Sequence, residues 1–225
     1  MSARGFPRSF LIHAHRRLTK SALEDVRAYA RLVTDMMTKH AKEHEAYVDE
    51  AVSKLSEEER EAYFDNNYDT YELLVRRFPN QQQQSLVVLA YSVVESRLIA
   101  VAQALMRQSN SGLTLKDLSG DSPFQKTRRV MSKVAGFEID QRLWDSVEAY
   151  RQIRNAIAHN AGDIGANPPQ LAKQLLAQRS SEIQNSPSEG LVLQPTFVFG
   201  LVDASELLLN AVFQCWLEVE TPNAA

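Results

Sequence analysis

The chain has 225 residues, of which 44% are hydrophobic and 24% are charged, a composition that is ordinary for a globular protein with a sizeable core. The net charge of -3 and the isoelectric point near 6.0 exclude a protein that coats DNA by general electrostatic attraction, but they leave room for a local basic site. We expect neither a membrane span nor a secretory signal, because no uninterrupted apolar run has the required length. The only cysteine, Cys215, excludes a disulfide within the chain and predicts the reducing cytoplasm as the setting.

The first third of the chain predicts a basic arm followed by a helical extension. Residues 1–20 contain five basic side chains and no acidic one. Ser21 to Glu24 form the pattern of a capping box, which predicts the start of an amphipathic helix that runs to about residue 50. The sequence "SEEE" at 56–59 repeats this start signal. Residues 43–72 hold eleven acidic residues against two basic ones, which indicates a solvated helix face. We therefore expect residues 1–65 to form an extension and residues 66–225 to form the main domain.

The remaining elements are predicted from helical periodicity and from caps. The sequence "FPNQQQQ" at 78–84 interrupts the pattern, and an almost wholly apolar helix follows it. Ser122, Pro123 and Gln125 start a helix that ends near Gly136. The other expected elements are a helix from about Asp140, a short helix at "QLAKQLLAQ", a minor β pairing of "LVLQ" with "TFVF" within 191–199, and a last helix over 201–219. The fold class is all-α.

The helix from Asp140 ends in "YRQIRNAIAHNAG", where polar side chains interrupt an apolar pattern. At 100° per residue, Leu143, Val147, Tyr150, Ile153 and Ile157 share the core side, while Glu148, Gln152, Asn155 and His159 form a polar column. Arg154 projects from within the apolar arc, about 140° from His159. A buried guanidinium needs a partner, and Glu95 in the apolar helix is one candidate. Two interpretations remain open: a buried Arg154–Glu95 ion pair, or a site that binds phosphate.

The segment "WDSVEAYRQIRNAIAHNAG" resembles the signature of the HEPN superfamily, the higher eukaryotes and prokaryotes nucleotide-binding domain. That signature is an Arg, usually followed by Asn, with a His a few residues later near a helix end; Arg154, Asn155 and His159 match it. The sequence "LAYSVVESRL" is similar to the family's central helix, and Glu95 matches its acid. The resemblance covers about residues 66–219 and implies a helical bundle that forms a homodimer through the helices carrying the motif.

The resemblance also implies a metal-independent endoribonuclease of toxin–antitoxin, phage-defence or RNA-processing systems. Histidine moves protons near neutral pH, and the planar fork of arginine matches a phosphate. Arg154, Asn155 and His159 are therefore the predicted catalytic residues, with Glu95 as an orienting residue. Two motifs facing across a two-fold axis would form one composite site, and cleavage by the ribose 2′-OH would leave 2′,3′-cyclic phosphate ends. We expect no cofactor. The alternative function is a catalytically inactive HEPN dimer that binds RNA, a nucleotide or a protein.

Further residues are predicted to contact partners. The RNA-binding prediction rests on one basic helix face, which carries Lys126, Arg128, Arg129 and Lys133. An antitoxin or a nucleotidyltransferase is a further partner that the resemblance suggests, and we expect no membrane partner. The string "HAKEH" at 40–44 has the form of a zinc-protease motif, but its charged surroundings offer no third ligand, so we predict no metal site.

Overall fold

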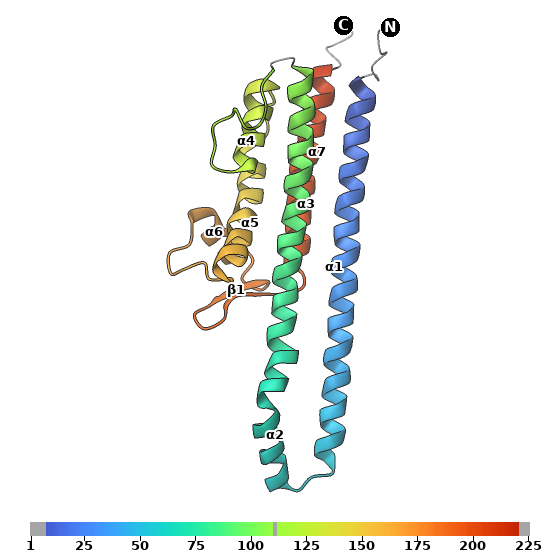
Figure 1. The fold of residues 1–225 in the computed structure, drawn as a ribbon, viewed down its shortest axis with the longest axis vertical. Helices are drawn as coiled ribbons and strands as arrows, with labels where there is room; N and C mark the ends of the chain where they lie inside the picture. The colour runs from blue at the N-terminus through green and yellow to red at the C-terminus, as the bar shows by residue number, and fades with distance from the viewer. Residues whose placement is uncertain (1–7, 110–111, 221–225) are drawn as a thin grey trace.

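The computed structural model describes residues 8–109 and 112–220 and confirms an all-α fold with one two-stranded sheet (Figure 1). The α-helices are α1 (Arg8–Ser53), α2 (Glu57–Glu72), α3 (Phe78–Gln108), α4 (Pro123–Arg129), α5 (Gln141–Asn160), α6 (Gln170–Gln178) and α7 (Phe197–Glu220). Two π-helical turns, η1 (Leu73–Arg77) and η2 (Val130–Val134), continue α2 and α4, and the strands are β1 (Ile183–Ser186) and β2 (Gly190–Leu193). The long helices run side by side, and the hairpin of α1 and α2 extends beyond the rest of the bundle (Figure 1).

Helix α1 begins well before the predicted start, so the expected basic arm is wrong for residues 8–20; residues 1–7 lie outside the described part of the chain. Ile12 and Thr19 are both buried and therefore extend the core-facing side of the helix upstream of Ser21. No Gly or Pro interrupts residues 8–53, and the capping pattern at Ser21–Glu24 is therefore overridden by helix on both sides. Ile12, Leu23 and Ala30 belong to the same core as α3 and α7, and the expected boundary at residue 65 falls inside α2.

Helix α2 begins at the capping box that the sequence predicts. The Ser56 hydroxyl accepts a hydrogen bond from the Glu59 backbone N–H at 3.4 Å, and the Glu59 carboxylate accepts one from the Ser56 backbone N–H at 2.8 Å. None of the residues of α2 is buried. The hairpin of α1 and α2 therefore carries little core of its own.

The sequence "FPNQQQQ" does not end a helix, which corrects the predicted break. The backbone runs from α2 through the π-helical turn η1 directly into α3, with Pro79 in its first turn. The Phe78 N–H bonds to the Leu73 carbonyl, five residues earlier, so the wider turn precedes the proline. A π-turn accommodates the missing N–H and the bulk of a proline ring without breaking the helix.

Helix α3 forms the centre of the bundle, as its apolar sequence predicts. Twelve of its residues are buried, among them Leu86, Ala90, Val94 and Leu98, and it packs against α1, α5 and α7. Ser122 caps α4 through a 3.2 Å hydrogen bond from the Gln125 N–H, as predicted. Helix α7 starts at Phe197, earlier than expected, because Phe197 and Val198 are buried in the core.

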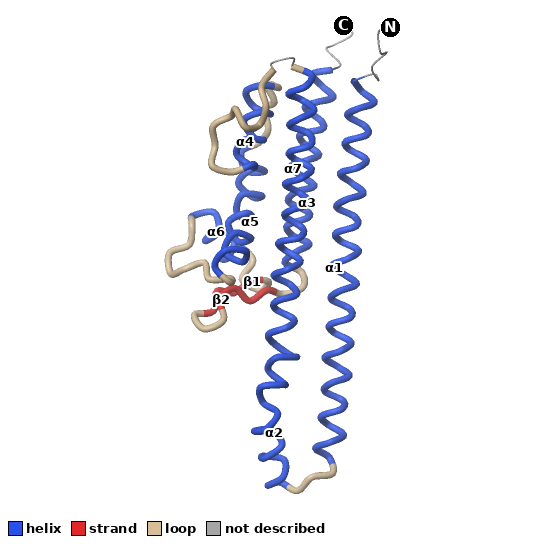
Figure 2. The backbone as a smooth tube through the Cα atoms, viewed as in Figure 1, coloured by secondary structure: helices blue, strands red, loops and turns tan. Residues whose placement is uncertain are grey.

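The β pairing exists, but its partner strand differs from the prediction. β2 pairs antiparallel with β1, with Ile183 opposite Leu193, whereas "TFVF" turns into the start of α7 (Figure 2). The other edge of β2 is paired with side chains of α3. Asn80 Nδ2 donates to the Leu191 carbonyl at 3.1 Å, the Leu193 N–H donates to Asn80 Oδ1 at 2.9 Å, and Gln84 Nε2 donates to the Leu191 carbonyl at 2.8 Å. These amides satisfy the backbone groups that an edge strand would otherwise expose.

Within residues 8–109 and 112–220, two helical stretches are long and apolar enough to cross a membrane, contrary to the expectation from the sequence: Glu57–Gln108 and Phe197–Val219. In this structure 44% and 56% of their most apolar windows lie buried inside the bundle. A core helix of a helical bundle has the same length and composition as a membrane span. These helices therefore do not decide between a soluble and a membrane setting.

Candidate functional site

The helix that carries the motif has well-defined ends. The Asp140 side chain accepts a hydrogen bond from the Arg142 N–H at 2.9 Å and caps the start of α5. At the other end Ala161 (φ 51°) and Gly162 (φ 85°) adopt the left-handed conformation, whereas Asn160 remains helical. A Cβ at residue 162 would lie 3.1 Å from Gln84 Nε2. The chain therefore leaves α5 immediately after the motif, in a turn that favours glycine.

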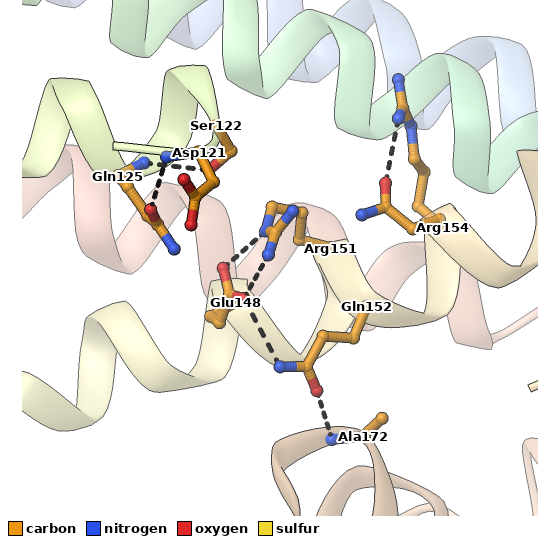
Figure 3. A network of polar contacts seen from close by, with 9 residues as sticks. Asp121, Ser122, Gln125, Glu148, Arg151, Gln152, Arg154 and Ala172 are labelled. Atoms are coloured by element: carbon orange, nitrogen blue, oxygen red, sulfur yellow. Dashed lines mark hydrogen bonds and ion pairs between the residues drawn. The ribbon is translucent and has the colours of Figure 1, made fainter. Parts of the chain in front are cut away.

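The two predicted faces of α5 are present. Val147, Tyr150 and Ile153 are buried in the core. On the polar column Gln152 Nε2 donates to Glu148 Oε1 at 3.4 Å, and Gln152 Oε1 accepts a hydrogen bond from the Ala172 N–H at 2.9 Å (Figure 3). Because that N–H is one of the unpaired donors at the start of α6, Gln152 fixes α6 against α5.

Arg154 points toward α3, away from Glu148 and Gln152 (Figure 3). Its guanidinium carbon lies 5.5 Å from the centre of the Tyr91 ring, and its Nη1 donates to Asn155 Oδ1 at 3.1 Å. Its Nε is buried and has no hydrogen-bond partner. Among the described residues no carboxylate forms an ion pair with Arg154, although a partly buried guanidinium usually has one.

The buried Arg154–Glu95 ion pair, one of the two interpretations of the sequence, is therefore not formed. Glu95 instead lies near Arg151 and Tyr91. The hydrogen bond to Glu148 is the main cause that raises the pKa of the Arg151 guanidinium, and the negative charge of Glu95 adds to that rise. Burial first, and then the charge of Glu95, hold the pKa of Tyr91 well above its usual range. Arg151 itself forms a two-point ion pair with Glu148, with both contacts at 2.6 Å and side chains that are 19% and 18% exposed.

His159 is exposed and Asn155 is half-buried, and within the described chain His159 makes no side-chain hydrogen bond or ion pair. Between the positions of Arg154 and His159 lie Ile157 and Ala158, which form one wall of a shallow groove of about 770 Å³. The other wall is α3, and the side chains that it contributes are uncharged: Gln81, Gln84, Ser85, Val88, Leu89 and Ser92. The groove therefore runs along the motif between two helices, and none of the side chains that line it is charged.

The four predicted RNA-binding residues lie at the other end of α5. Arg128 lies 5.8 Å from the Trp144 ring centre and hydrogen-bonds Gln141, and Arg129 donates to the Ser119 carbonyl at 2.8 Å. Lys126 is half-buried and Lys133 is exposed. Thirteen residues of helix separate Gln141 from Arg154, which corresponds to about 20 Å. The structure therefore does not bring these residues together with the motif.

The His-x-x-Glu-His string lies on an exposed part of α1. His40 Nδ1 lies 3.5 Å from Glu43, and the ring of His44 lies 6.4 Å from that of Tyr71. Across residues 8–109 and 112–220 there is no group of three or more His, Cys, Asp or Glu side chains placed to hold a metal ion.

The sequence analysis missed Tyr91 as a neighbour of the motif. Tyr91 is 1% exposed, and its hydroxyl is buried without a hydrogen-bond partner. It precedes Glu95 by four residues, so both lie on one face of α3, and that spacing is the signal that could have identified it. The site thus contains two buried polar atoms without protein partners, Tyr91 Oη and Arg154 Nε.

Comparisons with models of protein families, with curated proteins and with solved structures found no match for this chain.

Proposed function

We propose that the protein is a metal-independent endoribonuclease of HEPN type that acts as a cytoplasmic homodimer. The observation that carries the proposal is the state of Arg154. Its guanidinium is partly buried, has no carboxylate partner in the described chain and has an Nε without any partner. A charge in such surroundings is stabilised by an anion, and the phosphate of RNA fits the planar fork of arginine.

The neighbouring side chains supply the remaining chemistry. His159 is exposed and makes no side-chain hydrogen bond or ion pair with the described residues, so it is available to a substrate. In the proposed reaction one His159 removes the proton of the ribose 2′-OH, the oxygen attacks the adjacent phosphorus, and the bond from phosphorus to the 5′ oxygen breaks. The His159 of the second subunit gives a proton to the leaving 5′ oxygen. Arg154 stabilises the charge on the phosphoryl oxygens, and Asn155 orients its guanidinium through their hydrogen bond.

The geometry of α5 supports a role for a second subunit. Arg154 and His159 diverge by about 140° around one straight helix, so one chain does not direct both at one phosphate. The groove between α3 and α5 contains the exposed Leu89, 42% accessible, beside small polar side chains. We propose this face as the contact between the two subunits, with the two motifs facing each other across it. An antitoxin or a nucleotidyltransferase would regulate such an enzyme.

The test is cleavage of labelled tRNA and mRNA by the purified protein in EDTA. We expect cuts with 2′,3′-cyclic phosphate and 5′-hydroxyl ends, and we expect His159→Ala and Arg154→Ala to abolish them. His40→Ala is the matched control, because it removes another exposed histidine that the proposal does not use. Unchanged cleavage by His159→Ala would refute the catalytic role of His159. A dimer that binds RNA without cutting it would instead identify the inactive adaptor.

A further inference from the structure

A cavity of about 700 Å³ lies where the hairpin of α1 and α2 leaves the rest of the bundle (Figure 1). Six residues of α1, from Thr34 to Glu45, line it, and at 100° per residue they fall within an arc of about 140°. The other walls are η1, the first turns of α3 and one face of the sheet, where Gln184 and Val192 lie opposite each other in register. Cavities of this volume hold drug-sized ligands.

The π-helical turn η1 contributes Val75 and Arg76 to the cavity. Single π-turns inside α-helices are frequent at functional sites, so this turn has a second explanation besides the proline that follows it. The apolar side chains of the wall come from α1, η1, α3 and the chain around β2: Met37, Ala41, Val75, Pro79, Val192 and Pro195.

Gln83 is a buried polar residue of the cavity wall, with a side chain that is only 5% exposed. Its Nε2 donates a long hydrogen bond, at 3.4 Å, to the Thr34 hydroxyl, and its Oε1 has no hydrogen-bond partner. Asn80 in the same wall differs, because both ends of its amide bond β2. A buried carbonyl oxygen without a donor destabilises a fold, and a ligand that supplies an N–H removes that cost.

The charged side chains of the cavity are two cations and two carboxylates: Lys42, Arg76, Glu45 and Glu189. Across residues 8–109 and 112–220 none of these four forms an ion pair. Their neighbours outside the cavity do, since Glu43 lies 3.7 Å from Lys39 and Arg77 lies 3.2 Å from Glu72. A nucleotide or a polyphosphate would meet two like charges here, whereas a molecule with one end of each sign finds a partner for both ends.

We propose that this cavity binds a short peptide with apolar side chains and free termini. The two cations bind its terminal carboxylate, the two carboxylates bind its terminal ammonium, and a peptide N–H donates to Gln83 Oε1. The apolar side chains of the peptide pack against those of the wall. This site shares no residue with the proposed ribonuclease site and does not depend on that function.

The first test is saturation-transfer NMR of the full-length protein with a mixture of all tripeptides of alanine, valine, leucine and phenylalanine. We expect transfer to a subset of them, and calorimetry then measures the affinity of the strongest binder. Acetylation of its N-terminus and amidation of its C-terminus should each weaken binding by about tenfold or more, because each removes a charged end. Absence of transfer to every tripeptide, equal affinity of the blocked forms, or tighter binding of free leucine or of ATP would overturn the proposal.

The second test locates the carboxylate in the cavity. Arg76→Ala is expected to weaken the free peptide by about tenfold and to leave the affinity of the amidated peptide unchanged. Arg77→Ala is the matched control, because this neighbour on η1 lies outside the cavity and pairs with Glu72. It should bind the peptide as the wild type does.

The third test concerns the unpartnered oxygen. Gln83→Leu is expected to weaken the peptide by about threefold to tenfold without lowering the melting temperature, because it removes a buried acceptor that has no donor. Gln82→Leu, at an exposed position outside the cavity, should leave the affinity unchanged. Wild-type affinity for the free peptide in either Arg76→Ala or Gln83→Leu would overturn the proposal.

Discussion

The substitution Arg154→Ala separates a structural arginine from one that binds a phosphate. In the folded chain Arg154 contributes a cation–π contact with Tyr91 at 5.5 Å, which is worth about 0.5–2 kcal/mol. It also donates one hydrogen bond to Asn155, worth about 0.5–1.5 kcal/mol. The burial of its Nε without a hydrogen-bond partner opposes these two contributions and destabilises the fold by about 1–3 kcal/mol. These contributions nearly cancel, so we expect the free energy of unfolding to change by no more than about 1 kcal/mol.

The effect on the reaction is expected to be much larger. Removing one donor that stabilises a developing oxyanion slows an enzyme by about 10²–10³-fold. Arg154→Ala should therefore lose RNA cleavage at nearly wild-type stability, measured by single-turnover cleavage and by urea denaturation of the same preparation. Arg151→Ala is the matched control on the same helix. It breaks a two-point, mostly buried pair with Glu148, and we expect a loss of about 2–3 kcal/mol of stability.

The reasoning fails if Arg154→Ala destabilises the fold by about 3 kcal/mol or more, which is the usual cost of leaving a buried charge unpaired. In that case Arg154 would have a carboxylate partner in solution and would be structural. The proposal that it binds phosphate would then lose the observation on which it rests.

Three further predictions concern stability. Tyr91→Phe removes a buried hydroxyl without a partner and should raise the melting temperature by about 2–4 °C for roughly 1 kcal/mol; a lower melting temperature would mean that the hydroxyl has a partner. Burial, and then two nearby arginines, lower the pKa of His15 below 6.5. The folded protein therefore favours the neutral imidazole, and this contribution to the free energy of unfolding is complete above pH 6.5 and is lost as the pH falls through the lowered pKa. Thermal unfolding from pH 7.5 to 5 should show a smaller loss in His15→Gln than in the wild type, and equal losses would contradict this assignment. Asn80→Ala removes two hydrogen bonds to the edge of β2 and should lower the free energy of unfolding by about 2 kcal/mol in urea denaturation. Gln82→Ala on the exposed side of α3 should leave the free energy of unfolding almost unchanged. Equal losses in the two variants would show that β2 docks without Asn80.

Elements whose ends depend on local chemistry could be predicted from the sequence. Ser56 and Ser122 cap their helices as predicted, because a capping hydrogen bond spans only three residues. The pattern at Ser21–Glu24 has the same form but lies inside α1. A capping signal shows where a helix is able to start, while burial of Ile12 and Thr19 upstream decides that this helix starts earlier.

Features that depend on distant segments could not be predicted. The "TFVF" segment is apolar and short, so periodicity alone does not separate a strand from a buried helical turn. Its helical state is set by packing of Phe197, whose ring centre lies 5.3 Å from that of Tyr150. The Arg154–Glu95 ion pair, one of the two interpretations of the sequence, is absent for a related reason. The sequence places Glu95 and Arg154 on facing helices, but the axial register of α3 against α5 brings Tyr91, one turn from Glu95, beside the guanidinium.

The end of α5 connects the small sheet to the proposed chemistry, and this connection yields a prediction about activity. The Gly162 carbonyl accepts a hydrogen bond from the Leu191 N–H at 2.9 Å, and Gly162 follows His159 by three residues. Asn80 holds the same strand against α3. Loosening the strand should therefore move His159, although Asn80 is not a proposed catalytic residue.

A displacement of about 1 Å at a reacting group can slow an enzyme by about a hundredfold. We accordingly expect Asn80→Ala to reduce RNA cleavage by about tenfold to a hundredfold at temperatures where the variant is still folded, and Gln82→Ala to cleave at the wild-type rate. Cleavage at the wild-type rate by folded Asn80→Ala would mean that α5 alone positions its last turn. The left-handed turn at Ala161 and Gly162 would then be sufficient, and the sheet would serve stability only.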